Sequence, residues 1–277
     1  MKNVKGQTSP TLEVNALSFS YGSYHPVFED VSFSVQAGEV LVLLGPNGCG
    51  KTTLLNCIAG LLRSPSGHIQ IEGLDSAQLS PVQRALHMSY LPQIQDTSFD
   101  FTVIDYVVMG CAPRLRFGRS PGRSEYLRAQ ELLERLDVAS LANTSCSHIS
   151  GGERQQAQIA RVLMQDTALI LMDEPTNHLD YGNQIKMLRM IDNLIGQGHA
   201  ILMTSHVPDH AIMLDGSVAI INREGAFSSG AVSEVLDAQL LENLYGERIA
   251  LHWMDEYDRS VCVPECVCTG KPKNPEY

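Results

Sequence analysis

Hydrophobic and polar residues alternate over much of the first 40 positions of the chain. In residues 12–35 the apolar side chains recur at every second position, as in Val31, Phe33 and Val35. This period of two is typical of antiparallel strands with one face on a core and the other in solvent. Residues 40–44 are continuously apolar instead. Such a run indicates a strand that is buried on both faces of a parallel sheet.

Two further apolar runs, residues 168–172 and 200–203, have the same character, and each ends in polar residues. Asp173 and Glu174 follow the first of them, and a polar triplet ending in His206 follows the second. In doubly wound α/β sheets, ligands bind outside the carboxyl ends of the strands. We therefore expect an α/β fold in which these polar residues gather at one edge of one sheet.

The middle of the chain has a helical period. Tyr126, Ala129, Leu133 and Leu136 recur at spacings of three and four with charged residues between them. This spacing predicts an amphipathic helix, and we expect an inserted helical lobe around it. Beyond the lobe, residues 218–221 predict another strand that leads into a turn.

The composition indicates a globular protein without a general nucleic-acid surface. The chain has 277 residues, of which 44% are hydrophobic and 18% charged, and its formal net charge is −11. Binding along a phosphate backbone requires a basic face, so we expect no nucleic-acid partner. The first ten residues lack the apolar core of a secretory signal, and no apolar run approaches the roughly 18 residues of a membrane span. We expect a cytosolic polypeptide that reaches a membrane only through a partner.

Five arginines cluster within the predicted lobe. They are Arg114, Arg116, Arg119, Arg123 and Arg128. A charge cluster of this kind forms either a solvated face or a docking surface for a partner, and the residues alone leave both interpretations open.

The strongest chemical motif directly follows residues 40–44. It matches the phosphate-loop pattern G-x-x-x-x-G-K-[ST], between a predicted strand and a helix expected over residues 52–62. Its residues are Gly45, Pro46, Asn47, Gly48, Cys49, Gly50, Lys51 and Thr52. The glycines allow backbone N–H groups to surround phosphate at the positive end of the helix. Lys51 supplies charge to the β- and γ-phosphates, and the hydroxyl of Thr52 is a ligand for Mg²⁺.

Seven cysteines are scattered along the chain. Without an extracellular context they do not predict a disulfide framework. Cys262, Cys266 and Cys268 lie close together, but their spacing is not that of a common zinc site, and we expect a disordered tail with free thiols. Cys49 lies near a helix N-terminus, so we expect a somewhat acidified thiol that is open to alkylation and that a bound nucleotide protects.

The acidic pair and the histidine at the strand ends complete a candidate catalytic set. Asp173 would lie in the Mg²⁺ shell, and Glu174 could activate the attacking water as a general base. Two acids after an apolar strand could also be a solvated turn, although a preceding phosphate loop favours the catalytic interpretation. His206 is either a polar residue with a satisfied hydrogen bond or a donor to the γ-phosphate.

The segment Ser150-Gly151-Gly152-Glu153 has two interpretations. Ser followed three residues later by Glu is a capping box, which would begin a helix over residues 154–164. That explanation gives no reason for two glycines, which weaken a helix. Glycines allow a backbone to approach phosphate closely. We therefore expect half of a second nucleotide site, completed by a partner.

With these motifs in this order, the chain resembles the ATP-binding subunit of ABC transporters over roughly residues 10–245. By this resemblance, residues 45–52 form the Walker A loop and residues 169–174 the Walker B strand. Residues 150–153 are similar to the family signature, with Ile149 in place of the usual leucine.

The resemblance assigns roles to further residues. Gln93 is similar to the Q-loop glutamine on Mg²⁺ or water, residues 177–180 to the D-loop and His206 to the switch histidine. Tyr21 matches the aromatic residue that stacks on adenine. The implied catalytic residues are Glu174, His206 and Gln93. The implied ATP-binding residues are Tyr21, the loop from Gly45 to Thr52, and Thr53. The implied trans site is Ser150, Gly151, Gly152, Glu153 and Asp180. The implied metal ligands are Thr52, Gln93 and Asp173.

The resemblance also implies a domain organisation. An ABC ATPase domain would occupy residues 10–245. Its phosphate-loop core, with a mixed sheet and an antiparallel β subdomain, would span about 10–92 and 160–245, and its helical lobe about 95–158. Residues 246–277 would be a tail.

The finer similarity, over residues 102–119 and 177–184, is to subunits of importers for iron–siderophore complexes, haem, cobalamin or molybdate. It implies a head-to-tail dimer around two ATP, two membrane-spanning permease subunits, an external substrate-binding protein and a peripheral position on the cytoplasmic face of the membrane. ATP would close the dimer and hydrolysis would open it. The alternatives are a soluble ABC-type ATPase acting on DNA or ribosomes, and an exporter subunit. The acidic charge and the absence of a long coiled coil disfavour the soluble alternative.

Overall fold

The computed structural model describes residues 9–22, 25–64, 66–93, 100–116, 118–177 and 179–265. A six-stranded sheet with the order β10-β9-β3-β8-β7-β6 forms its centre. The strands are β3 (Val40–Leu44), β6 (Met88–Leu91), β7 (Leu169–Met172), β8 (Ala200–Ser205), β9 (Ser217–Ile221) and β10 (Phe227–Ala231). The first five are parallel, and β10 pairs with β9 in the antiparallel sense. The predicted α/β fold is confirmed.

The strand β3 is buried on both faces, as its uninterrupted apolar sequence predicted. Val40, Val42 and Leu44 belong to one hydrophobic core, and Leu41 and Leu43 belong to the other. Because side chains alternate along a strand, each face of the sheet has its own core. The loop after β3 therefore begins from a rigid position.

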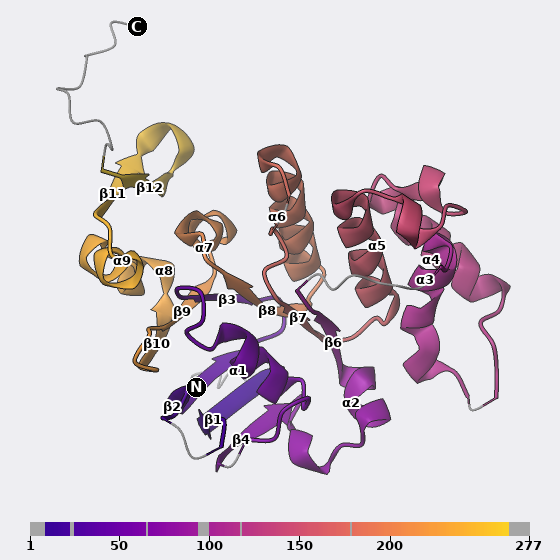
Figure 1. Ribbon diagram of the computed structural model, residues 1–277, viewed down its shortest axis with the longest axis horizontal. Helices are drawn as coiled ribbons and strands as arrows, with labels where there is room; N and C mark the ends of the chain where they lie inside the picture. Colours follow the sequence, from indigo (N-terminus) through magenta and orange to yellow (C-terminus); the bar gives the residue numbers. More distant parts are fainter. Residues whose placement is uncertain are drawn as a thin grey trace, which may run out of the picture.

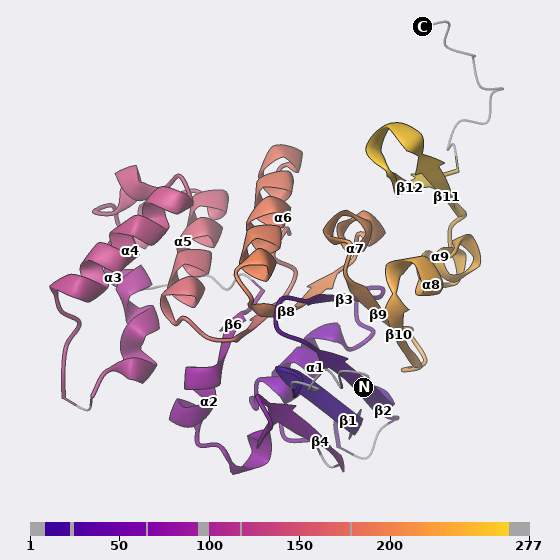
Figure 2. The same ribbon diagram turned by 180° about the vertical axis from the view of Figure 1, so that it is seen from behind.

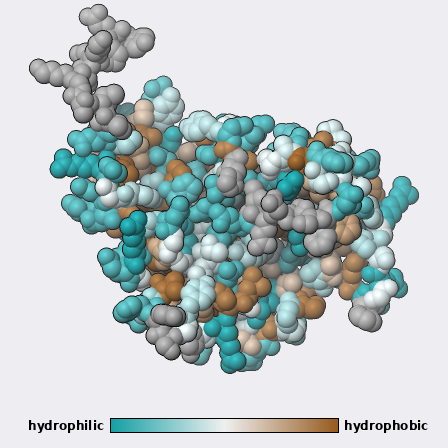
Figure 3. Space-filling model, in the orientation of Figure 1, coloured by the Kyte–Doolittle hydropathy of each residue, from teal (hydrophilic) through white to brown (hydrophobic). Residues whose placement is uncertain are grey.

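A four-stranded antiparallel sheet with the order β2-β1-β4-β5 packs beside the central one. Its strands are β1 (Leu12–Phe19), β2 (Phe28–Val35), β4 (Ser66–Ile71) and β5 (Leu74–Asp75). The alternating residues Val31 and Val35 are buried and Asp30 and Ser34 exposed, which confirms the half-solvated pattern. Figure 3 shows a mainly hydrophilic surface on this side of the molecule, with small hydrophobic groups over the antiparallel sheet.

Helices cover both faces of the central sheet. They are α1 (Lys51–Ile58), α2 (Pro81–His87), α3 (Val103–Val108), α4 (Arg123–Arg135), α5 (Gly151–Met164), α6 (Tyr181–Gly196), α7 (Pro208–Leu214), α8 (Val232–Val235) and α9 (Ala238–Tyr245). Figures 1 and 2 show α1 between the two sheets, and α6 and α7 on the opposite face. The helix α1 ends earlier than predicted, because Gly60 adopts a left-handed conformation shortly after Ile58.

The helices α3, α4 and α5 pack against one another at one end of the molecule (Figure 1). In α4 the residues Ala129 and Leu133 are buried as the helical period predicted, whereas Tyr126 is 37% exposed and donates a hydrogen bond to Asp105 Oδ1 at 2.8 Å. In the part of the chain that the structure describes, no helix is long and apolar enough to cross a membrane.

Two of the five clustered arginines form ion pairs within the chain. Arg114 Nη1 lies 2.8 Å from Asp166 Oδ2, and Arg128 Nη2 lies 3.0 Å from Asp166 Oδ1. These guanidinium groups hold the pKa of Asp166 below its usual value, with the hydrogen bond from Arg128 as the largest cause. Arg116, Arg119 and Arg123 are exposed. Two members of the cluster therefore stabilise the fold through Asp166, and the other three lie in solvent.

The C-terminal segment differs from its expectation. Residues 249–264 form an antiparallel hairpin of β11 (Ile249–Met254) and β12 (Arg259–Pro264), rather than a disordered tail. The hairpin packs on α7 and α9, and the backbone N–H of Cys262 donates to Asp209 Oδ1 in α7 at 3.1 Å. Cys266 and Cys268 lie outside the described residues, and so does any metal site that would include them.

Candidate nucleotide-binding site

The phosphate loop turns sharply between β3 and α1, and its glycines are needed for that geometry. Gly48 and Gly50 have φ angles of +82° and +109°, which L side chains rarely adopt. A Cβ at Gly45 would lie 2.4 Å from the carbonyl oxygen of Ile221, and one at Gly50 would lie 2.5 Å from Val27 Cγ1. The loop is therefore a close-fitting cradle of backbone, as a phosphate group requires.

Lys51 lies inside this loop. Its side chain is 5% exposed, and Nζ donates to the carbonyl oxygens of Gly45 at 2.7 Å and Pro46 at 3.2 Å. The same Nζ lies 3.7 Å from Glu174 Oε1. The loop thus holds one positive charge next to the strand-end carboxylates.

At the end of β7, Asp173 is buried and Glu174 turns out of the strand. Glu174 has a φ of +49°, which costs a residue with a side chain on the order of 1–2 kcal/mol. Thr204 on the neighbouring β8 contacts both acids. Its hydroxyl donates to Asp173 Oδ1 at 2.7 Å and accepts from the backbone N–H of Glu174 at 2.8 Å. The sequence had singled out Thr204 only as part of a polar strand end.

Polar groups from three other segments surround the Glu174 carboxylate. Gln93 Nε2 lies 3.5 Å from Oε2, and Asn177 Nδ2 donates to the same oxygen at 3.2 Å. His206 Nδ1 lies 3.8 Å from it. The structure therefore brings Lys51, Glu174 and His206 together, as the parallel strand ends predicted, and it places Gln93, which only the resemblance had indicated, beside them.

These residues line a cleft with a volume of about 620 Å³. Its lining consists of Tyr21, Val27, Asn47, Gly48, Gly50, Lys51, Thr52, Thr53, Gln93, Glu174, Asn177 and His206. At the rim, Tyr21 is 52% exposed, and its hydroxyl lies 3.2 Å from Thr53 Oγ1. An exposed ring in this position presents a face on which a base can stack.

Three members of the motif do not reach the cleft. Gly45, Pro46 and Cys49 are buried, and none of them is among the residues that line the cleft. Burial raises the pKa of the Cys49 thiol, and the nearby Lys51 opposes this shift without reversing it. The prediction of a somewhat acidified cysteine is therefore wrong, because desolvation outweighs the charge of Lys51 and the backbone hydrogen bonds that favour the thiolate.

The residues present fit a magnesium ion beside the phosphates. Asp173 Oδ2 is buried and has no hydrogen-bond partner among the described residues, while Oδ1 is held by Thr204. A buried carboxylate oxygen without a donor suits a cation or its bound water. Thr52 and Gln93 line the adjoining cleft and could supply further oxygen ligands.

The segment at residues 150–153 is a complete capping box. Ser150 Oγ accepts from the N–H of Glu153 at 3.3 Å, and Glu153 Oε2 accepts from the N–H of Ser150 at 2.8 Å. The second hydrogen bond is the largest cause of a lowered pKa at Glu153. Asp180 is likewise a helix cap, accepting from the N–H of Asn183 at 2.8 Å at the start of α6.

The two glycines of this segment have no explanation within the described part of the chain. A Cβ at Gly151 would meet no atom within 4 Å, and one at Gly152 would meet only Leu179 Cδ2 at 3.8 Å. Neither glycine has a positive φ. None of residues 150–153 is among those that line the cleft. Both glycines therefore leave the start of α5 open, and Gly152 also borders the cavity between α5 and α6.

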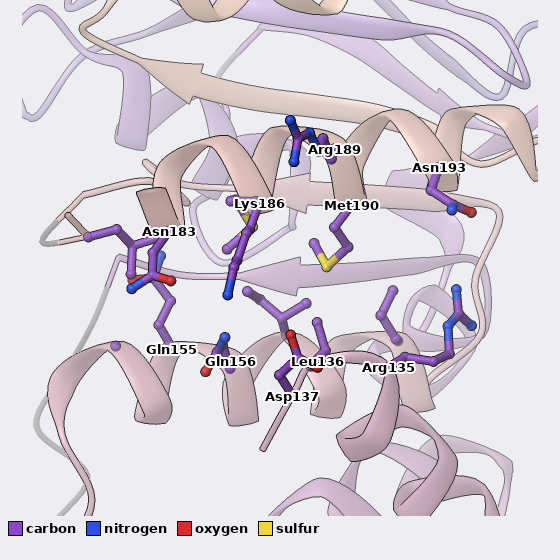
Figure 4. A pocket seen from close by; sticks show the side chains of 15 residues that line it. Arg135, Leu136, Asp137, Gln155, Gln156, Asn183, Lys186, Arg189, Met190 and Asn193 are labelled. Carbon is purple, nitrogen blue, oxygen red and sulfur yellow. The ribbon is translucent and has the colours of Figure 1, made fainter. Parts of the chain in front are cut away.

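A second cavity of about 390 Å³ lies between α5 and α6 (Figure 4). Its walls are mainly apolar and amide side chains with three basic residues. Gln155 borders it, and the buried Gln155 Oε1 has no hydrogen-bond partner among the described residues. Asp137 is the one carboxylate of its lining. The cavity therefore lacks the paired acids and phosphate cradle of the first cleft.

His210, which the sequence did not single out, supports the cleft from behind. It is 4% exposed, and its Nδ1 lies 2.9 Å from Ser205 Oγ and 3.5 Å from Thr176 Oγ1. Burial lowers its pKa from 6.5 to about 4, with a further decrease from the neighbouring His206. It is therefore neutral in the folded protein at pH 7.

This histidine predicts a loss of stability in mild acid. Below pH 6.5 the unfolded chain binds a proton at His210 that the folded chain does not bind until about pH 4. The free energy of unfolding should therefore fall by about 2 kcal/mol between pH 6.5 and 5 on this account. Urea unfolding of wild type and His210→Asn over this range measures it. The variant should lose clearly less stability; parallel curves would contradict the assignment.

A backbone cradle holding a buried lysine, opposite two strand-end carboxylates, defines a phosphate-loop nucleoside triphosphatase. The chain matches the ABC transporter family over residues 28–177, which is more than half of its length. It therefore belongs to the ABC transporter family, as a nucleotide-binding ATPase whose hydrolysis is coupled to transport.

Individual relatives and a solved structure agree with this assignment. The chain is 34% identical over 248 residues to a probable iron chelatin transport ATP-binding protein of Helicobacter pylori strain J99, covering 88% of this chain and 96% of that protein. It is 35% identical over 246 residues to a hemin import ATP-binding protein of Thermobifida fusca, covering 88% and 86%. An inward-facing metal-chelate type ABC transporter superposes with a TM-score of 0.81 at 27% identity, over 94% of this chain and 99% of that one.

Proposed function

We propose that this chain is the ATP-hydrolysing subunit of an importer for metal chelates, with an iron–siderophore complex as the first candidate cargo. Haem, cobalamin and molybdate are the next candidates. The observation that supports this choice is the near full-length similarity to proteins named for iron chelatin, hemin and molybdate import. The likeness to a metal-chelate type transporter supports the same class.

In this proposal Glu174 is the general base. Its carboxylate accepts hydrogen bonds from Gln93 and Asn177, which orient it, and it is positioned to take a proton from water attacking the γ-phosphate. Lys51 and His206, on either side of it, donate to the γ-phosphate. Thr52, Asp173 and Gln93 would hold Mg²⁺, which when bound neutralises charge on the β- and γ-phosphates. Tyr21 stacks on adenine.

Dimerisation completes each site in this proposal. The glycines at 151 and 152 are unconstrained by their own chain, which supports a role in contacting phosphate bound to a second copy. Ser150, Glu153 and Asp180 would lie at the same interface. A head-to-tail dimer then encloses two ATP molecules.

The other partners follow from the cargo. Two membrane-spanning permease subunits would carry the chelate, and an external substrate-binding protein would deliver it. The chain would then lie on the cytoplasmic face of the membrane as a peripheral subunit. Within the arginine cluster, only Arg116, Arg119 and Arg123 are suited to docking, because Arg114 and Arg128 pair with Asp166.

Uptake of labelled cargo tests the proposal directly. Cells whose only copy of this chain carries Glu174→Gln should lose accumulation of ⁵⁵Fe-siderophore to background, with molybdate, haem and cobalamin uptake unchanged. A cell line with Glu72→Gln, which removes an equal charge outside the cleft, is the matched control. Loss of one of the other cargoes instead would correct the substrate. Unchanged uptake of all four, with co-sedimentation of the chain with ribosomes or DNA, would contradict import.

A further inference from the structure

The buried hydroxyl of Thr204 is the link between the two acids of the cleft. Thr204 has no exposed surface and lies on β8, one position beyond the register pair Met172–Met203. It donates its proton to Asp173 Oδ1 and accepts the N–H of Glu174, so both of its hydrogen bonds go to the acidic pair. One hydroxyl can do both, since it has one donor and two acceptor positions.

The Glu174 N–H depends on this contact because the strand has already ended. The last paired residue of β7 is Met172, and Glu174 lies two positions further in a left-handed conformation. This turn directs its carboxylate toward Lys51 and Asn177. Backbone N–H groups that leave a sheet must find another partner, and the Thr204 hydroxyl is that partner.

The other hydrogen bond selects between the oxygens of Asp173. Oδ1 is occupied by Thr204, and Oδ2 has no partner among the described residues. The carboxylate is therefore fixed in one rotation with one oxygen uncommitted. A carboxylate that could rotate would present either oxygen.

We propose that Thr204 is a positioning residue for ATP hydrolysis: its hydroxyl sets the backbone of Glu174 and the rotation of Asp173 together. The inference rests on the proposed roles of these acids. Because a displacement of about 1 Å at a reacting group can reduce a rate about 100-fold, loss of the hydroxyl should affect turnover much more than binding.

Three variants of the full chain separate positioning from simple packing. Thr204→Val removes the hydroxyl at nearly constant volume, and Thr204→Ser keeps the hydroxyl. Thr167→Val is the matched control, since Thr167 is also buried and hydrogen-bonded, to Ser89 Oγ at 3.0 Å and the Leu169 carbonyl at 2.9 Å, but at the opposite end of β7.

Steady-state ATP hydrolysis and nucleotide affinity give the first readout. Thr204→Val should lower kcat roughly 10- to 100-fold, with KM and nucleotide Kd within about threefold of wild type. Thr204→Ser should recover kcat to within about threefold, and Thr167→Val should leave kcat unchanged. Hydrogen–deuterium exchange of the peptide spanning residues 170–177, measured without nucleotide, gives the second readout. The amide exchange rate of this peptide should increase in Thr204→Val and in neither of the other two variants.

The inference is overturned if Thr204→Val keeps a kcat within about threefold of wild type, or if Thr204→Ser is as impaired as Thr204→Val. Loss of turnover in Thr167→Val, or unchanged exchange at residues 170–177 in Thr204→Val, overturns it as well. Failure of the proposed function has a different signature. In that case wild type does not hydrolyse ATP, or Glu174→Gln hydrolyses it normally, whereas the exchange measurement still tests the hydrogen bonds of Thr204.

Discussion

Replacing Glu174 with Gln should reduce ATP turnover at least about 100-fold while ATP binding is retained. An amide has nearly the shape of the carboxylate and its oxygen still accepts from Gln93 and Asn177, but it cannot take a proton from water. The left-handed backbone at this position tolerates Gln as well as Glu, so the turn after β7 should persist. The loss therefore reports proton transfer rather than collapse of the cleft.

Three measurements check this result. Phosphate release gives turnover, a fluorescent nucleotide gives affinity, and light scattering with ATP gives the mass of the complex. The variant should bind ATP and accumulate as a dimer. Glu72→Gln is the control, because Glu72 is not among the residues that line the cleft. Its Oε2 lies 2.6 Å from His87 Nδ1. Turnover in Glu174→Gln within about threefold of wild type would remove Glu174 from the role of base.

Mixing two inactive variants should restore hydrolysis if each ATP site is shared between chains. Lys51→Met removes the positive charge of the phosphate loop and leaves residues 150–153 unchanged. Gly151→Leu blocks the segment 150–153 and leaves the phosphate loop unchanged. Each variant alone should lose at least about 100-fold in turnover. In an equimolar mixture about half of the dimers pair one variant with the other, and each of those has one intact site. Activity should recover to about a quarter of wild type when the two sites act independently.

The structure makes Gly151→Leu a discriminating variant. Nothing lies within 4 Å of a Cβ at Gly151, and its φ is not positive, so the folded chain accommodates a side chain there. Removing a glycine from a helix should leave stability unchanged or raise it by up to about 1 kcal/mol. Gly196→Leu is the matched control, as Gly196 lies at the end of α6 with equally open surroundings. No recovery in the mixture, with both variants folded, would place the whole site within one chain.

Much of the fold could be predicted because its strands are unambiguous in sequence. Residues 40–44 have no polar side chain, and a strand that is buried on both faces of a parallel sheet has this kind of continuous apolar sequence. The convergence of Lys51, Glu174 and His206 followed from the parallel direction of their strands. The buried face of the amphipathic helix α4 was predicted less exactly. Tyr126 lies at the solvent edge of the predicted face, and the buried Leu132 was not predicted.

What could not be predicted depends on contacts between distant segments. The left-handed turn at Glu174 and its hydrogen bond to Thr204 are set by the register of β7 against β8, which no local pattern encodes. The C-terminal hairpin was missed because its strands bury few residues and depend on α7 and α9 for a core. Cys49 was misjudged because its burial depends on the packing of the whole loop.

The central position of β3 in the sheet has a consequence for biosynthesis. Its two neighbours, β8 and β9, come from residues 200–221, so β3 leaves the ribosome long before either partner exists. At ordinary translation speeds this interval lasts roughly 10–30 s, during which an uncharged apolar strand is unpaired and open to aggregation. The antiparallel sheet has a much shorter delay, because β1, β2, β4 and β5 all lie within residues 12–75. The phosphate loop is therefore anchored only after residue 221 has been synthesised, and a truncated chain cannot complete the pocket that binds ATP.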